Sequence, residues 1–408
     1  MLTPEYLYRI TEGAEEIASQ LHANIIQKII ERMMIRIGRG EDYLLTATDK
    51  WQIEVLQDAG YLLEDIQKEI ADKTKKQVKE IQDAMEDAGV QALQWDDKIY
   101  QAAGLSPVPL LQSPTLMRLM QRNYEATAGE WRNFTRTTAN EAQRLFINQM
   151  DNAYNMVTSG AVSYTEAVRD AINRVSDTGV KVSYPSGHKL SIEAATMMIV
   201  RTGISQAAAE VTSARMEEMD WDIVLVSAHL GARTGDGGMN PGNHLWWQGQ
   251  FYSRTGRTKD YPDFKKSTGY GTGEGLCGWN CRHSFGPGDG INNSFSDKDI
   301  AYADNYNAEK LQQRQRQLER RIRNTKREIQ SLQTAIDNSG DDKLKFELQQ
   351  QLDRKAYKLK RQSKEYKQYC KDNNLKEYAE RLKVAKWDKK QAAKAAGAAK
   401  RYQNAKGE

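Results

Sequence analysis

Apolar residues recur at spacings of three and four over most of the chain, the period of one buried helix face. Near the N-terminus this run comprises Ile10, Ala14, Ile17, Leu21, Ile25 and Ile29. Thr3 and Pro4 precede it as an N-cap and a first helical residue. The glycines in residues 37–40 end it. We therefore expect a long helix at the start of a mainly helical protein.

The same helical period continues, with interruptions, to about residue 219. Residues 51–60 form a helical stretch that Gly60 is expected to end, and more helix follows to about residue 93. Residues 104–114 hold three of the eight prolines and predict a break. Ser163 with Glu166 has capping-box spacing, and Ser191 can cap the next helix. No strand is expected before residue 219.

The pattern changes at residue 221. Residues 221–229, WDIVLVSAH, favour a β-strand. Residues 231–290 contain 15 of the 29 glycines together with several large aromatic residues. This composition predicts a small, loop-rich α+β module whose aromatic side chains supply the core.

Helical periodicity returns after residue 306. One seam comprises Leu318, Ile322, Thr325, Ile329, Leu332 and Ile336, and a second comprises Leu348, Leu352, Leu359, Tyr366 and Tyr369. Residues 338–342, NSGDD, end one helix and cap the next. Two helices of similar length joined by a short turn are expected to pair as an antiparallel coiled-coil hairpin. The low-complexity end predicts a frayed helix or a tail.

The expected organisation therefore has five parts. It comprises an N-terminal helical region at 1–103, a second helical region at 104–220, a Cys/His module at 221–295, a coiled-coil hairpin at 296–390 and a tail at 391–408. The fold class is mainly α, with an elongated helical N-terminal region.

Charge is distributed unevenly along the 408 residues. Residues 301–408 contain 28 Lys and Arg against 15 Asp and Glu, a net charge of +13, whereas residues 1–300 carry −9. The basic residues of the hairpin are most simply a solvated coiled-coil face. The alternative is sequence-blind contact with DNA phosphates. The candidate DNA-contact residues are Arg314, Arg316, Arg320, Arg321, Arg323, Lys326 and Arg327.

Composition and the N-terminal sequence indicate the compartment in which the chain is made. Mean hydropathy is −0.76, and no apolar run approaches the roughly 18 residues of a membrane span. The start, MLTPEYLYRITEGAEE, has no signal-peptide pattern. We therefore expect a cytoplasmic site of synthesis, where cysteines stay reduced.

Two of the three cysteines and three of the five histidines lie in the glycine-rich module. The candidate zinc ligands are His229, His244, Cys277, Cys281 and His283, five residues for four positions. A small module benefits from a metal staple, which favours structural over catalytic zinc. The alternatives are thiols packed as small hydrophobes and a Cys277–Cys281 disulfide. The sequence does not decide which of His229 and His244 takes part.

Enzyme motifs match poorly in this region. No H-E-x-x-H or zinc-deaminase arrangement is present, and the Cys281–His283 pair has no evident orienting partner. Residues 269–275, GYGTGEG, lack the Gly-Lys-Ser/Thr ending of a phosphate-binding loop. We therefore predict no catalytic residues; a zinc-dependent hydrolase or nuclease is the weaker alternative.

Several stretches together resemble the phage minor capsid protein 2 family, which is related to Mu F-type head morphogenesis proteins. They include VSAHLGAR, HLWWQGQFYS and LCGWNCRHSFGPG in the module, with TATDKWQIEVLQDAG, YPSGHKLSIEAA and QRQLERRIRNTKREI outside it. Residues 234–243, TGDGGMNPGN, depart from the family pattern as an insertion between His229 and His244.

The resemblance implies a virion component of a tailed bacteriophage, made in the bacterial host cytoplasm. It implies a structural minor head protein near the portal, acting in head assembly and in genome packaging or delivery. The implied partners are the portal and major capsid proteins, with packaged DNA at the basic hairpin. A sequence-nonspecific DNA-binding virion protein is the alternative.

Overall fold

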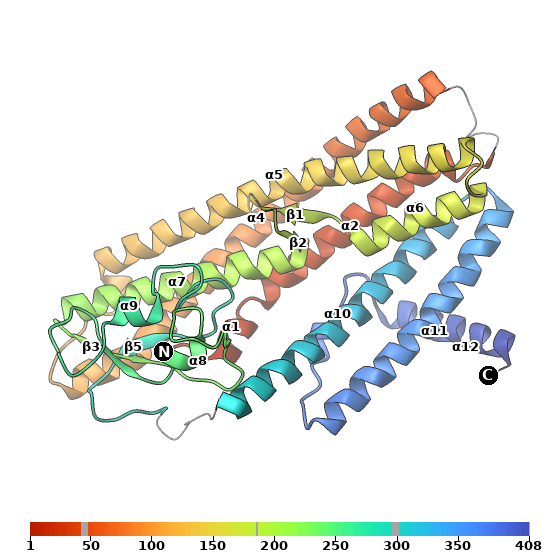
Figure 1. Cartoon of the computed structure of the whole chain (residues 1–408). Coiled ribbons are helices and arrows are strands. Elements are labelled where there is room, and N and C mark those ends of the chain that lie inside the picture. The colour runs from red at the N-terminus through yellow and green to blue at the C-terminus, as the bar shows by residue number, and fades with distance from the viewer. Residues whose placement is uncertain (42–47, 185–186, 296–301, 408) are drawn as a thin grey trace. The chain divides into compact units, whose positions relative to one another are not determined.

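The computed structural model describes residues 1–41, 48–184, 187–295 and 302–407 (Figure 1). These residues divide into two compact units. Unit 1 comprises 1–15, 75–132 and 196–313, and unit 2 comprises 16–74, 133–195 and 314–408. Each unit is therefore assembled from three separate stretches of sequence. The expected mainly helical class with one small sheet module is confirmed.

Most of the described chain is long helix. The first elements are α1 (Pro4–Arg9), α2 (Glu12–Ile37), α4 (Thr48–Ala102), η1 (Leu110–Gln112), α5 (Pro114–Thr158), α6 (Tyr164–Thr178) and α7 (Ile192–Glu218). Thr3 caps α1 by accepting a hydrogen bond from the Tyr6 amide at 3.1 Å. Both halves of the capping box between Ser163 and Glu166 are present at α6. These local start signals were correctly predicted.

Two expectations for the helical region were wrong. Gly60 does not end a helix, because α4 continues through it to Ala102. Ala59 and Leu62 on either side are fully buried, and such packing outweighs a glycine cost of about 1 kcal/mol. The structure also contains a short antiparallel pair before residue 219, β1 (Lys181–Ser183) with β2 (Lys189–Ser191). Three-residue strands are too short to produce a detectable alternation.

The core of unit 1 has two parts. Helical side chains from α1, α4, α5 and α7 form one cluster, which includes Leu7, Ala88, Leu116 and Ile204. The second cluster joins the ends of α4 and α7 to the glycine-rich module, through Tyr100, Met216, Trp247 and Phe264 among others. The module is therefore anchored on helices of its own unit.

The glycine-rich module is built on a three-stranded antiparallel sheet of order β4-β3-β5. Its elements are β3 (Ile223–Val226), α8 (His244–Trp247), β4 (Phe251–Ser253), α9 (Phe264–Thr268) and β5 (Phe285–Pro287). Central Val224 pairs with Tyr252 on one side and Pro287 on the other. This confirms the predicted strand in 221–229.

Unit 2 contains the C-terminal hairpin. Its elements are α10 (Tyr302–Asn338), of which residues 314–338 belong to this unit, α11 (Asp342–Asp372), η2 (Glu380–Leu382) and α12 (Lys389–Lys406). Gln315 contacts Cys370, and Lys355 pairs with Glu328. These pairings run in opposite directions along the two helices and confirm the antiparallel arrangement.

The end of the chain is a packed helix. Arg401 on α12 makes two hydrogen bonds to Asp353 on α11, at 2.9 and 2.7 Å. The rings of Tyr402 and Tyr357 lie 5.4 Å apart. Of the two expected forms of the last residues, a frayed helix or a tail, the structure therefore shows a helix, and it is docked.

Candidate metal centre

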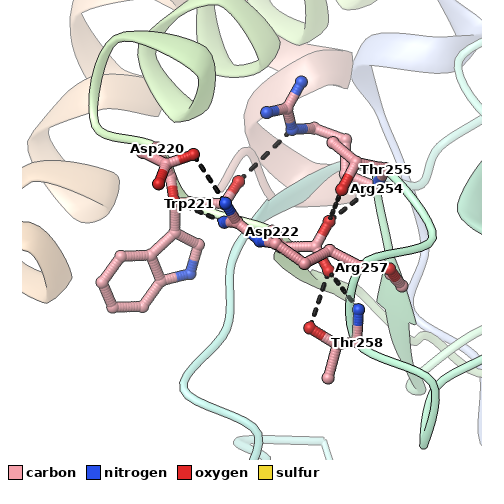
Figure 2. Close-up of polar contacts among 8 residues, drawn as sticks. Asp220, Trp221, Asp222, Arg254, Thr255, Arg257 and Thr258 are labelled. Carbon is pink, nitrogen blue, oxygen red and sulfur yellow. Dashed lines mark hydrogen bonds and ion pairs between the residues drawn. The ribbon is translucent and has the colours of Figure 1, made fainter.

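Asp222 ties the start of β3 to the loop that follows β4. Its buried carboxylate accepts five hydrogen bonds, from the hydroxyls of Ser253, Thr255 and Thr258 and from the amides of Thr255 and Thr258. Figure 2 shows the two threonines facing this carboxylate. Burial alone would raise the pKa of Asp222, but these hydrogen bonds lower it well below its usual value. Because it accepts five hydrogen bonds, the Asp222 carboxylate acts as a structural anchor.

His244 is positioned by the first turn of α8. Asn243 caps that turn by accepting a hydrogen bond from the Trp246 amide, and the His244 amide donates to the Arg233 carbonyl at 2.7 Å. The inserted segment before it is ordered by Asp236, which accepts hydrogen bonds from Gly238 and Asn240. The insertion therefore does not prevent His244 from reaching the module's interior, where it is 2% exposed.

Cys277, Cys281 and His283 lie on a tight turn. Cys277 and Asn280 have positive φ angles of 59° and 56°, a conformation that costs roughly 1 kcal/mol for a non-glycine residue. The Cys281 amide donates to the Gly278 carbonyl at 3.1 Å. This turn directs Cys281 and His283 into the module, where both are buried.

Glycines allow the turn to close. A Cβ atom on Gly275 would lie 2.3 Å from the Gly269 carbonyl oxygen, and one on Gly278 would lie 2.4 Å from that of Gly273. Close backbone approach therefore explains Gly275 and Gly278.

Three of the five candidate ligands converge. One donor atom from each of His244, Cys281 and His283 lies within 4.8 Å of the other two. The Cys281 sulfur is 3.8 Å from Nδ1 of His244 and 3.7 Å from Nδ1 of His283. This answers the question that the sequence left open: the structure groups His244, and not His229, with the cysteine.

The other two candidates border this group. The His229 ring stacks on the His283 ring, with centroids 4.2 Å apart and planes at 24°, and its Nδ1 lies 3.2 Å from the Leu230 carbonyl oxygen. The Cys277 sulfur lies 3.7 Å from the His283 carbonyl oxygen. Cys277, Cys281 and Cys370 are all free thiols, so the disulfide alternative is wrong.

Three partners of the histidines were missed by sequence analysis. Gln248 Oε1 lies 2.9 Å from Nε2 of His283 and accepts from the His229 amide at 3.1 Å. His244 Nε2 lies 2.8 Å from the Glu274 carbonyl oxygen and 3.0 Å from the Arg233 guanidinium. Neither a glutamine nor a main-chain carbonyl carries a ligand signature in the sequence, so these partners could not be recognised from it.

Burial controls the protonation of the three converging residues. It lowers the pKa of His244 to about 4 and that of His283 well below its usual value. It raises the pKa of the Cys281 thiol. Both imidazoles are therefore neutral near pH 7, which is the form that binds metals.

Comparison with known proteins identifies the chain. A family model described as phage minor capsid protein 2 matches residues 2–371. The chain belongs to the phage minor capsid protein 2 family. No curated protein and no solved structure matches it. The match covers parts of both compact units and places the chain among structural proteins of the phage capsid.

The predicted DNA-contact residues of this minor capsid protein fall into two groups. Arg314, Arg316, Arg320 and Arg321 are exposed on α10, where Arg314 and Arg321 both approach Glu365 at 3.3 Å. The others are engaged within unit 2: Arg323 and Lys326 donate to the carbonyls of Arg381 and Leu382, and Arg327 pairs with buried Glu193. For the exposed four, contact with DNA stays a prediction.

Among the described residues, no helix combines the length and apolar character that a membrane crossing requires.

Proposed function

We propose that this chain is a structural minor head protein that acts in head assembly near the portal, with a part in genome packaging or delivery. The observation that carries the proposal is the family match across residues 2–371. The proposed partners are the portal and major capsid proteins, and the proposed location is the phage head.

The surface of unit 1 supports a role in protein contacts. Residues 105–117 comprise most of the connection from α4 to α5 and the first turn of α5, and their exposed apolar side chains are those of Leu105, Val108, Leu111 and Met117. Apolar side chains concentrated on one exposed segment are typical of protein-contact surfaces. We assign to this segment a contact with another head protein.

The cluster of His244, Cys281 and His283 supports a structural rather than enzymatic role. Glu274 meets His244 through its main-chain carbonyl and not its carboxylate. No carboxylate belongs to the group of donors that the described residues bring together. A zinc hydrolase usually places a carboxylate as general base beside its metal, so the arrangement favours a role in holding the fold.

The test of this proposal measures whether the chain is incorporated into phage heads. Phage heads purified from cells that express the tagged full chain are expected to contain it, and heads assembled without it are expected to be defective. Leu111→Asp should reduce incorporation at least several-fold, whereas Met239→Asp, on an even more exposed side chain of the glycine-rich module, should not. Absence of the wild-type chain from purified heads would contradict the proposed function.

A DNA contact is the second candidate function. The exposed side chains of Arg314, Arg316, Arg320 and Arg321 favour it, because they lie on one stretch of α10. Such residues would neutralise phosphates without reading bases.

A further inference from the structure

The two buried imidazoles of the module present the same nitrogen to one sulfur. His244 and His283 are 2% and 1% exposed, and both direct Nδ1 toward Sγ of Cys281. They come from different segments, since His244 begins α8 and His283 follows the turn of residues 276–281. The tautomer of each ring decides whether its Nδ1 presents a hydrogen or a lone pair to the sulfur.

The tautomer of His283 follows from Gln248. The His229 amide can only donate, so the Gln248 atom that receives it at 3.1 Å must be the carbonyl oxygen. That same oxygen lies 2.9 Å from Nε2 of His283. Nε2 therefore carries the hydrogen, and Nδ1 of His283 presents a lone pair to Cys281.

The tautomer of His244 follows from Glu274. The shortest contact of Nε2 is 2.8 Å, to the Glu274 carbonyl oxygen, which can only accept. The neighbouring Arg233 guanidinium can donate to the Trp279 carbonyl instead of to this nitrogen. We assign the hydrogen of His244 to Nε2, so that its Nδ1 also presents a lone pair to Cys281.

The two Nδ1 lone pairs both need a hydrogen, and among the described residues only the Cys281 thiol is placed to supply one. The Cys281 thiol carries one hydrogen and can donate it to only one of the two nitrogens. The His283 amide also donates to this sulfur, at 3.4 Å. A cation between the three atoms would satisfy both lone pairs and a thiolate together.

We propose that His244, Cys281 and His283 bind a zinc-class divalent cation through Nδ1, Sγ and Nδ1. This goes beyond the capsid role and does not depend on it. Tetrahedral zinc, with Zn–N near 2.0–2.1 Å and Zn–S near 2.3 Å, separates a nitrogen from a sulfur ligand by about 3.6 Å. The 3.8 and 3.7 Å separations here agree with that spacing. One thiolate with two imidazoles favours zinc over magnesium or calcium.

The surroundings match those of a built metal site. Gln248 and the Glu274 carbonyl hold the outer nitrogen of each ring, as orienting groups do around zinc. The Trp247 ring lies 4.5 Å from that of His244 and 4.9 Å from that of His283, which makes one wall apolar. The ion would join α8 to the turn that leads into β5, across the loop-rich part of the module.

His229 provides the matched control. It belongs to the same module and its ring stacks on that of His283, but it is not part of the converging group of donors. Cys370 provides the matched thiol control, because it is buried on α11 in unit 2. Neither residue is part of the proposed donor set.

The test measures metal on the full chain. The protein is stripped with a chelator, loaded with zinc alone and analysed by elemental mass spectrometry; about one ion per chain is expected. Loading with cobalt(II) should give a thiolate-to-cobalt charge-transfer band. His244→Ala and Cys281→Ser should lose stoichiometric metal and this band, whereas His229→Ala and Cys370→Ser should keep both.

Three results would overturn the proposal. They are a wild-type chain that retains no zinc, a cobalt spectrum without a thiolate band, and a folded Cys281→Ser variant that binds as the wild type does. If the ligand variants do not fold, the wild-type cobalt spectrum and its persistence in Cys370→Ser decide the question. These readouts do not involve heads, so a failure of the capsid role would leave them unchanged.

Discussion

Gln248 holds the ring of His283 through one oxygen, which lies 2.9 Å from Nε2 and also accepts from the main chain of His229 at 3.1 Å. The side chain therefore links the end of the β3 segment to the histidine that precedes β5. Gln248 sets the orientation of the buried His283 imidazole without itself contacting the Cys281 sulfur. Its loss should therefore weaken metal binding at the proposed site.

Replacing Gln248 by leucine should weaken zinc binding without abolishing it. Loss of a group that orients a metal ligand typically costs about 10- to 100-fold in affinity, and a competition titration against a chromophoric chelator measures it. Gln250→Leu is the control, because exposed Gln250 donates only to the Trp246 carbonyl. Equal affinities for the Gln248 and Gln250 variants would show that Gln248 has no orienting role.

Asp222→Asn should destabilise the module far more than Asp220→Asn. Asp222 is 5% exposed and accepts five hydrogen bonds, while the Asp220 side chain is largely exposed and pairs with Arg257 at 2.8 Å (Figure 2). The expected cost at Asp222 is about 2–3 kcal/mol, since hydrogen bonds to charged groups are strong. Hydrogen exchange of the β3 and β4 amides measures the local loss, and similar protection in both variants would be unexpected.

The contribution of Asp222 should depend on pH. Its folded-state pKa lies below its unfolded value, so its stabilisation is fully present above the unfolded pKa of about 3.9. The stabilisation is lost as pH falls from there through the folded pKa. The difference in unfolding free energy between the wild type and Asp222→Asn should therefore be constant from pH 5 to 7, about two units, and shrink below pH 4. A difference that grows on acidification would contradict this.

Two glutamates that pair with arginines of α10 should differ in their effect on stability. Glu193 is buried and is shared by His22, at 2.8 Å, and Arg327. Burial would raise the pKa of Glu193, but the charges of Arg327 and His22 outweigh it and lower the pKa. Glu193→Gln should cost about 3–5 kcal/mol, whereas exposed Glu365→Gln should cost under about 1 kcal/mol. Urea unfolding of the full chain measures both, and equal midpoints would refute the distinction.

The exposed arginines of α10 should produce salt-dependent DNA binding. If Arg316 contacts a phosphate, Arg316→Gln should reduce the slope of log affinity against log salt by about 0.9. Arg118→Gln, on an exposed part of α5, should leave the slope unchanged. Titration of full-length protein with duplex DNA at several salt concentrations measures it, and binding that does not respond to salt would eliminate the DNA contact.

Local signals in the sequence predicted local structure correctly. Thr3, Ser163 and the turn at 338–342 begin helices because each places an oxygen beside an unpaired helix amide, which is decided within a few residues. The same reasoning failed at Gly60, where it predicted the end of a helix. Its neighbours bury their side chains in unit 2, and that gain is not visible in a short window of sequence.

The sequence alone determined the helical class, the glycine-rich module, the antiparallel hairpin and the five residues from which a metal site would be drawn. Only the tertiary structure decided that His244 joins Cys281 and His283, that His229 stacks outside them, and that Gln248 and the Glu274 carbonyl set their tautomers. Helix periods and caps follow from neighbouring residues. The direction of an imidazole nitrogen depends on contacts between residues about 30 to 40 positions apart, such as His244 with Glu274 and His283 with Gln248, and these form only when the sheet and its turns have folded.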